Sequence, residues 1–235
     1  MLPKIDYPVN AIKIPSTGKS AKFRPFLVKE EKLLLMAKES NVESDILHAI
    51  KQVVNNCSAE QKFDVDSLTI FDIEYIFLKL RSMSVDNKIT VSYKDFEDEK
   101  LYEFEIDLNN VEVEFPKDCE KNIKITSKSG IMLQYPSASL YDDKDFMNSD
   151  KEYLFELIVR CVDKIYEGDN IYEAKDYKLA DLRSFLENID IKTFEKIKLF
   201  LVNLPKLKHV INYKNSLGND REIILTSLTD FFTLR

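Results

Sequence analysis

The sequence LTIFDIEYIFLKLRSMSV, at residues 68–85, decides the fold of this chain. Its apolar residues fall almost all the way around a helical period of about 3.6 residues, so it predicts a buried central helix that other elements cover on several sides. No run in the chain approaches the ~18 consecutive apolar residues of a membrane span. Thr69 is the expected N-cap with Asp72 completing a capping box, and Leu68 and Ile73 are placed to form a hydrophobic staple.

Three charged residues interrupt this apolar helix: Glu74, Lys79 and Arg81. None of them has an opposite charge three or four residues away, where a helix would bring the two side chains together. A buried charge needs a partner, so these residues must be paired elsewhere in the fold or by another protein.

Length and composition describe an ordinary globular protein that can bury a large core. The 235 residues are 44% hydrophobic and 32% charged, which suits one large domain or two small ones. The N-terminus has no signal-peptide pattern, so we expect no export. Three widely spaced cysteines, Cys57, Cys119 and Cys161, favour free buried thiols in a reducing compartment. The net charge of −7 disfavours nucleic acid as a partner.

Charge is unevenly distributed along the chain. Residues 1–38 hold eight Lys or Arg and three acids, a net charge of +5. Residues 95–118 hold ten acids and two Lys, a net charge of −8. Either the acidic segment is a solvated rim on a sheet, or the two segments form a bipolar surface that steers a protein partner.

Periodicity outlines the remaining elements. Residues 7–14 read as a strand and 15–19 as a turn, whose spacing does not match a phosphate-binding loop. The expected helices cover residues 28–39, 42–57, 150–167, 179–188 and 192–203. Ser149 and Glu152 would cap the third of these, and Gly168 would end it. Alternating segments between residues 89 and 135 predict five strands in one antiparallel meander, and residues 207–213 and 222–229 predict a terminal hairpin.

Together these elements predict an α+β fold. Its helical core surrounds the buried central helix, with a small antiparallel β-meander inserted and a β-hairpin at the C-terminus. The expected regions are an N-terminal arm with three helices at 1–86, the β region at 87–148, and a C-terminal helical region at 149–235. The last region is also compatible with packing on the first as a single domain.

The sequence offers little material for catalysis. His48 and His209 belong to no catalytic motif, and the cysteines lack a nearby basic context. Only four glycines are present, too few for a glycine-rich cofactor loop. The expected hairpin at 93–108 contains no cysteine or histidine, so it predicts no metal site. We therefore expect no catalytic, cofactor-binding or metal-binding residues.

Four blocks of sequence resemble a known family. They are PSTGK at 15–19, RPFLVKEEKLL at 24–34, FDIEYIFLKLR at 71–81 and YPS at 135–137. These blocks are similar to the baseplate hub assembly proteins of T-even-type contractile-tailed bacteriophages, over roughly residues 8–140. The resemblance implies a role in building the tail baseplate, with other hub proteins as partners and no cofactor. It also implies a location in the host cytoplasm during assembly or in the virion baseplate.

The resemblance and the unmatched charges lead to one structural hypothesis. We expect Arg24 and the turn at 29–32 to pack beside the central helix. There Asp72 or Glu74 would form an internal ion pair with Arg24 or Arg81.

The candidate residues for core packing or partner contact are Arg24, Phe26, Glu74, Tyr75 and Arg81. Two functions stay open for a non-catalytic chain of this kind. One is an assembly chaperone that is absent from the finished particle, and the other is a permanent virion subunit with a large apolar interface. A nucleic-acid-binding factor would have to act through a basic strip near residues 13–32 alone.

Overall fold

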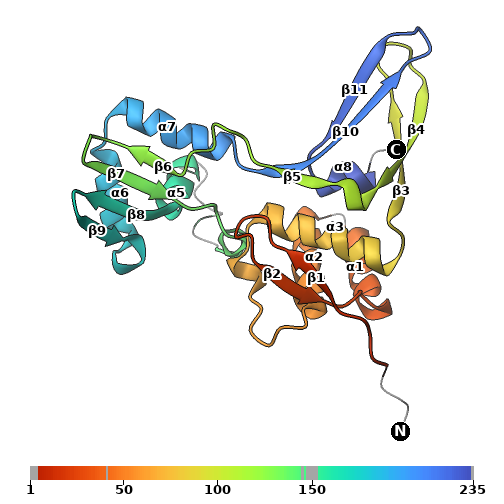
Figure 1. Cartoon of the computed structure of the whole chain (residues 1–235), viewed down its shortest axis with the longest axis horizontal. Coiled ribbons are helices and arrows are strands. Elements are labelled where there is room, and N and C mark those ends of the chain that lie inside the picture. Colours follow the sequence, from red (N-terminus) through yellow and green to blue (C-terminus); the bar gives the residue numbers. More distant parts are fainter. Residues whose placement is uncertain (1–4, 41, 144–145, 147–152, 234–235) are drawn as a thin grey trace. The chain divides into compact units, whose positions relative to one another are not determined.

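The computed structural model describes residues 5–40, 42–143, 146 and 153–233, and these residues divide into two compact units. Unit 1 comprises Met1–Glu114 and Lys206–Arg235, and unit 2 comprises Phe115–Pro205. These boundaries differ from the sequence-based region boundaries at 86/87 and 148/149. The described residues form seven α-helices and four small antiparallel sheets, so the mixed α+β class is confirmed (Figure 1). Among them, no helix is both long and apolar enough to cross a membrane.

The central helix of unit 1 is α3, Ile70–Ser84. Ile73, Ile76, Leu78 and Leu80 have no exposed surface, as expected for a helix covered on several sides. The predicted capping box is confirmed: Thr69 Oγ1 accepts from Asp72 N at 3.1 Å, and Asp72 Oδ2 accepts from Thr69 N at 3.2 Å. A local sequence signal therefore fixes where the buried helix begins.

Helices α1, Val28–Ser40, and α2, Glu43–Cys57, accompany α3 in unit 1, close to their predicted bounds. Strands β1, Asn10–Lys13, and β2, Ser20–Phe23, form a hairpin, and a short 3₁₀ turn, η1, covers Val65–Ser67. The turn of this hairpin is the predicted one at residues 15–19. Ser16 N donates to Asp72 Oδ1 at 2.8 Å, which ties the hairpin turn to the start of α3.

The predicted five-stranded meander is wrong, because its strands belong to three different sheets. Among the strands that the structure describes, β3, Lys88–Lys94, and β4, Leu101–Asp107, pair only with each other. Strand β5, Glu112–Glu114, follows the 3₁₀ turn η2, Leu108–Asn110, and pairs with β10, Lys206–Lys214. Alternation identifies a strand but does not identify its partner, and β5 finds a partner about ninety residues further along the chain.

The predicted C-terminal hairpin is confirmed, although its second strand is shorter than expected. Strand β10 pairs with β11, Asp220–Leu225, in antiparallel register from His209↔Leu225 to Lys214↔Asp220. The chain then forms α8, Leu228–Thr233, where the sequence predicted the strand to continue to residue 229. Asp230 accepts hydrogen bonds from Thr226 N and Ser227 N, which turns the backbone into this helix.

Unit 2 is a four-stranded sheet with helices. The strand order is β6 (Asn122–Lys124), β7 (Ser129–Leu133), β8 (Val162–Glu167), β9 (Asn170–Glu173). The helical elements are η3 (Ala138–Asp142), α5 (Tyr153–Arg160), η4 (Ala174–Asp176), α6 (Leu179–Glu187) and α7 (Ile191–Val202). Ile131, Ile158, Ile197 and Phe200 have no exposed surface and form the centre of this unit's own core.

The helix predicted at 150–167 is wrong in its second half. Helix α5 ends at Arg160, and residues 162–167 form β8 between β7 and β9. Gly168, expected to end the helix, has a φ of +58° in the β8–β9 turn. The apolar residues of this segment satisfy both periods, and ladder bonds to both neighbouring strands favour the strand. The predicted caps Ser149 and Glu152 lie outside the described residues.

Unit 2 is inserted between two residues that face each other on paired strands, Glu114 of β5 and Lys206 of β10. We predict that joining these two residues through Asn-Gly, with residues 115–205 removed, gives a folded unit 1. A two-residue turn spans such an antiparallel pair, and unit 1 retains its own buried core. Circular dichroism should show a cooperative thermal transition with helical signal. A product without a cooperative transition would contradict the independence of the two cores.

Candidate functional site

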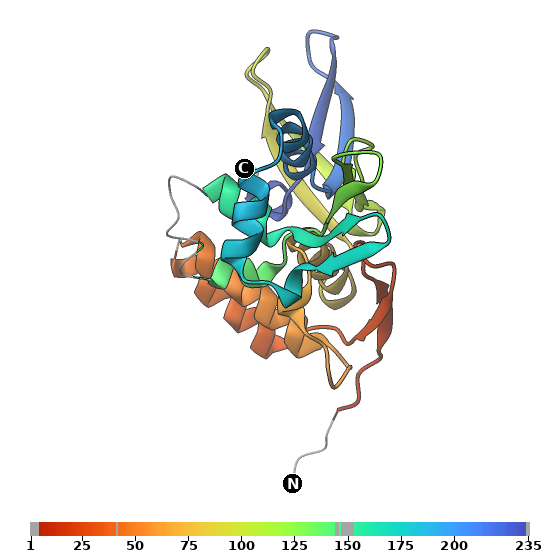
Figure 2. The same cartoon turned by 90° about the vertical axis from the view of Figure 1, so that its left-hand side faces the viewer.

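The two long hairpins of unit 1 form the most distinctive feature of the structure, which we call the hairpin arm. It consists of β3–β4 with its tip at residues 95–100 and β10–β11 with its tip at residues 215–219. Both hairpins extend away from α1–α3 toward the same end of unit 1 (Figures 1 and 2), and hydrogen bonds join their tips. An isolated hairpin is only marginally stable in water, so contacts between the two must hold the arm together.

Asp95 and Glu97 of the first tip accept hydrogen bonds from the second hairpin. The buried carboxylate of Asp95 accepts from Tyr213 Oη at 2.5 Å and lies 3.2 Å from Arg221 Nε. The carboxylate of Glu97 accepts from the side-chain amides of Asn215 and Asn219, both at 2.6 Å. Hydrogen bonds to a carboxylate are stronger than neutral ones, so these acids act as clamps between the hairpins.

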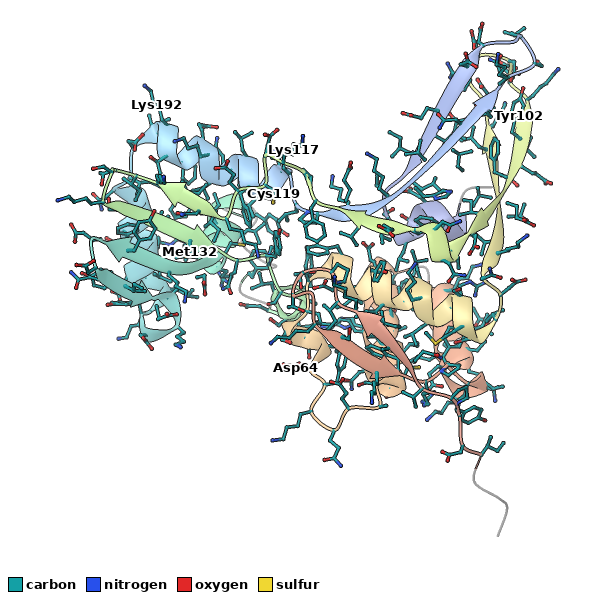
Figure 3. All side chains as sticks on the ribbon, in the orientation of Figure 1. Asp64, Tyr102, Lys117, Cys119, Met132 and Lys192 are labelled. Atoms are coloured by element: carbon teal, nitrogen blue, oxygen red, sulfur yellow. The ribbon has the colours of Figure 1, made fainter. Side chains whose placement is uncertain are left out.

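Asp98 extends the clamp to the backbone of the second tip. Its Oδ2 accepts from Ser216 N at 2.9 Å, from Ser216 Oγ at 2.8 Å and from Tyr102 Oη at 2.5 Å. Tyr102 is labelled near the end of the arm in Figure 3. Glu99, the next residue, has a φ of +58°, an uncommon conformation for a residue other than glycine. The first tip therefore presents three acids, Asp95, Glu97 and Asp98, to the other hairpin.

Aromatic side chains fill the arm behind its tips. The ring of Tyr213 lies 5.0 Å from Tyr102, 5.1 Å from Phe104 and 6.4 Å from Tyr93, centroid to centroid. Such pairs add stabilisation beyond the burial of their area. The arm is thus a packed structure with an aromatic centre and a polar clamp, rather than two independent hairpins.

The clamp shifts the pKa values of its members. Hydrogen bonding from Tyr213 lowers the pKa of Asp95. Burial opposes ionisation of Asp98, but hydrogen bonds from Tyr102 and Ser216 outweigh it and lower its pKa. Burial and the hydrogen bond to Asp95 raise the pKa of Tyr213 to about 12. Because the acid pKa values are lowered, the clamp is present above the ordinary aspartate value of about 3.8 and weakens as the pH falls below it.

This rigid frame carries exposed apolar side chains at its end. Phe96 is 85% exposed on the first tip, and Leu217 is 63% exposed on the second. Aromatic and aliphatic side chains held out by a preorganised frame are typical of protein contact sites, because little conformational entropy is lost on binding. The arm can therefore act as a docking element for another protein.

We predict that Asp98→Ala loosens the two tips without unfolding the rest of unit 1. The variant removes the acceptor of Ser216 Oγ and one of the two acceptors of Ser216 N, which also donates to Tyr102 Oη at 2.7 Å. Tyr102 loses its own hydrogen bond to Asp98 as well, so the Ser216 amide should exchange with solvent about threefold faster or more. Hydrogen exchange measured by NMR would detect this change. Asp220→Ala is the matched control, because within the described part of the chain the Asp220 side chain makes only an exposed 3.5 Å ion pair with Lys214. Equal exchange in both variants would contradict the clamp.

The comparison with protein families decides the identity. A family model described as T4 bacteriophage base plate protein matches residues 5–233. The chain belongs to this family. The resemblance inferred from the sequence is confirmed, and the match extends it over nearly the whole chain. The search of curated proteins gave no match, and neither did the search of solved structures.

In this base plate protein, the partner expected for Arg24 was wrong. Arg24 Nη2 lies 3.0 Å from Glu30 Oε1 of α1, so its ion pair is not with the central helix. Asp72 is used by the capping box and the β1–β2 turn, and Glu74 Oε1 accepts from Leu228 N of α8 at 3.4 Å. Sequence spacing could not show that Glu30, a first-turn acid, is fully buried.

The other candidate residues lie on or beside α3. Phe26 is buried, and its backbone N–H donates to Ser84 Oγ at 2.9 Å, which places it beside the end of the helix. Tyr75 is half-buried, with Lys79 Nζ 4.9 Å from its ring centroid. Arg81 is also half-buried and borders a groove of unit 1. All five residues thus belong to unit 1, but none of them lies in the hairpin arm.

Lys79, the remaining unmatched charge, has backbone partners. Its Nζ donates to the carbonyls of Leu108, Asn109 and Val111 at 3.0, 2.8 and 3.0 Å, which ties α3 to η2 and the start of β5. The residues of the arm clamp were not singled out from the sequence. The only signal for them was the acidic segment 95–118. Three of its acids accept hydrogen bonds from the other hairpin, and of these three Asp95 is buried while Glu97 stays exposed.

The chemical groups of the base plate protein give little support to catalysis. Burial raises the pKa of the Cys57 thiol to about 11 and that of Cys161 to about 12, so both thiols are protonated at neutral pH. The described residues contain no group of three or more His, Cys, Asp or Glu placed to hold a metal ion. A groove of about 730 Å³ in unit 2 contains Asp181 and Asp190, and both carboxylates accept helix-capping hydrogen bonds.

Proposed function

We propose that this base plate protein is a non-catalytic assembly chaperone that binds hub subunits of the phage tail through its hairpin arm. The observation that carries the proposal is the rigid display of Phe96 and Leu217 at the end of a clamped arm, in a member of a baseplate family. The chain would act in the host cytoplasm during assembly.

The charge of the arm indicates the chemistry of its partner. Glu99 and Glu103 are exposed on the first hairpin, close in sequence to Phe96. An acidic rim around an apolar contact favours a hub protein whose docking site has an apolar pocket bordered by Lys or Arg, and it also steers the encounter. Of the two interpretations of the uneven charge, this proposal adopts the surface that steers a protein partner, and it places the acidic part of that surface on the hairpin arm.

Purification of the tagged protein from infected cells tests the proposal. The wild-type chain should co-purify with a baseplate hub protein, and Phe96→Asp should lose most of that protein, because a charge replaces an apolar anchor. Ile191→Asp is the matched control, since Ile191 is 80% exposed but lies in unit 2. Equal recovery with both variants would remove the arm from the proposal.

The alternative function is a permanent structural subunit of the virion baseplate. Mass spectrometry of purified virions against infected-cell lysate separates the two functions. A chaperone is abundant in the lysate and absent from the virion, whereas a subunit is present in both. A chain found in the virion at a fixed ratio to other tail proteins would overturn the chaperone role.

Arg81→Met distinguishes core packing from partner contact at the central helix. Loss of the cooperative fold would assign Arg81 to the core, whereas an intact fold with failed hub assembly would assign it to a partner. We propose no nucleic-acid partner, because Arg24 of the basic strip near residues 13–32 is already paired with Glu30. A gel shift of DNA or RNA by the purified chain at low salt would contradict the absence of a nucleic-acid partner.

A further inference from the structure

Helix α1 is unusual because it leaves its apolar residues largely uncovered. In this 13-residue helix only Glu30 is buried. Val28, Leu35 and Met36 are 73%, 53% and 69% exposed. Most helices in proteins are stabilised by packing an apolar face against other elements. Helix α1 instead leaves these apolar side chains exposed to solvent.

Leu35 of this surface lines a groove of about 400 Å³ in unit 1. Helix α1 contributes Glu31, Leu34, Leu35, Ala37 and Lys38 to the groove. Residues of α2, α3 and α8 line the rest, and Arg81 of α3 is among them. Glu31, Leu34, Leu35 and Lys38 follow an i, i+3, i+4, i+7 spacing, which places these four on one helical face. The groove is therefore apolar along its centre and has one acid and one base at the two ends of its α1 wall.

The spacing of these residues makes the α1 face complementary to itself. When two copies of α1 pack antiparallel about a two-fold axis between Leu34 and Leu35, each Leu34 meets the other copy's Leu35. Each Glu31 then meets the other copy's Lys38. Within the described residues neither Glu31 nor Lys38 has an ion-pair partner in its own chain.

We propose that this groove is a self-association site, occupied by α1 of a second copy of this chain in an antiparallel two-fold arrangement. A two-fold interface is isologous and uses the same patch on both copies, as this pattern requires. Two copies of one leucine pair form the centre, and two copies of one ion pair flank it. This interface is separate from the hairpin arm, since it involves neither Phe96 nor Leu217.

Charge reversal tests the arrangement through rescue. Sedimentation equilibrium of the full chain should show a concentration-dependent dimer. Glu31→Lys should weaken the dimer about tenfold or more. At each end of the interface two lysine side chains, one from each copy, would then face each other and repel. The double variant Glu31→Lys/Lys38→Glu restores opposite charges and should return the dimer constant to within about threefold of wild type.

Two further measurements separate loss of association from loss of folding. Leu35→Glu should abolish the dimer while leaving the thermal transition cooperative, since Leu35 is already half exposed. Ile191→Glu, on unit 2, should leave the dimer unchanged. The double variant places a base in the first turn of α1 and an acid in its last turn, which is unfavourable with the helix dipole. Its thermal transition is therefore measured together with its dimer constant, so that a loss of stability is recognised. A wild-type chain that is monomeric at all concentrations, or a double variant as weak as the single one, would overturn the proposal.

Discussion

Replacing Arg24 with Met should lower the free energy of unfolding by about 3 kcal/mol at neutral pH. The Glu30 side chain is completely buried, and it relies on Arg24 at 3.0 Å and on Leu27 N at 2.8 Å. Without Arg24, a buried carboxylate keeps only the backbone donor and the exposed Lys29, 3.4 Å away. Chemical denaturation measures the loss.

The double variant Arg24→Met/Glu30→Met is the control for this prediction. It removes both charges, so it should recover much of the lost stability. The hydrogen bond from Arg24 helps to lower the pKa of Glu30 against the opposing effect of burial. A lowered acid pKa contributes stability that is present above the ordinary value and lost as the pH falls, so the Arg24→Met defect should shrink in acid. A loss below about 1 kcal/mol at neutral pH would show that the pair is effectively solvated.

The second large effect concerns Glu74 and has the opposite dependence on pH. Burial raises the pKa of this carboxyl to about 7, and the hydrogen bond from Leu228 N only partly opposes it. An acid with a raised pKa contributes stability below its ordinary value of about 4.5, and that contribution is lost as the pH rises to about 7. Glu74→Gln keeps an acceptor for Leu228 N but has no charge. We expect it to be more stable than wild type by up to about 3 kcal/mol at pH 8 and nearly equal at pH 4.

Denaturation of both proteins across this pH range measures the Glu74 effect. Glu103→Gln serves as the control, because Glu103 is exposed on β4 and its replacement should leave the pH profile unchanged. A Glu74→Gln curve parallel to that of wild type from pH 4 to 8 would contradict the burial of a neutral carboxyl beside α8.

Local signals in the sequence predicted the elements whose determinants are close together in the chain. Thr69 and Asp72 are three residues apart, and their capping box is in the structure. The hairpin at the C-terminus was also predictable, because alternating residues flank a turn at Gly218. The amphipathic α2 helix follows the same rule.

Long-range pairing could not be predicted in this way. Strand β5 reads as part of a local meander, but its partner β10 lies beyond the whole of unit 2. The segment 162–167 fits a helical pattern until its two sheet neighbours are known. The clamp between Asp98 and Ser216 joins residues more than a hundred positions apart, so an acidic run was the only sign of it. In each case the deciding partner is distant in sequence, and a single sequence contains no record of it.

Photo-crosslinking from position 96 in infected cells tests the central claim most directly. A photoreactive amino acid at Phe96, the most exposed apolar side chain of the arm tip, should give a crosslinked band that contains a baseplate hub protein. The same group at Ile191 should not give this band. Crosslinks to the hub protein from position 191 alone, or none from position 96, would contradict docking through the hairpin arm.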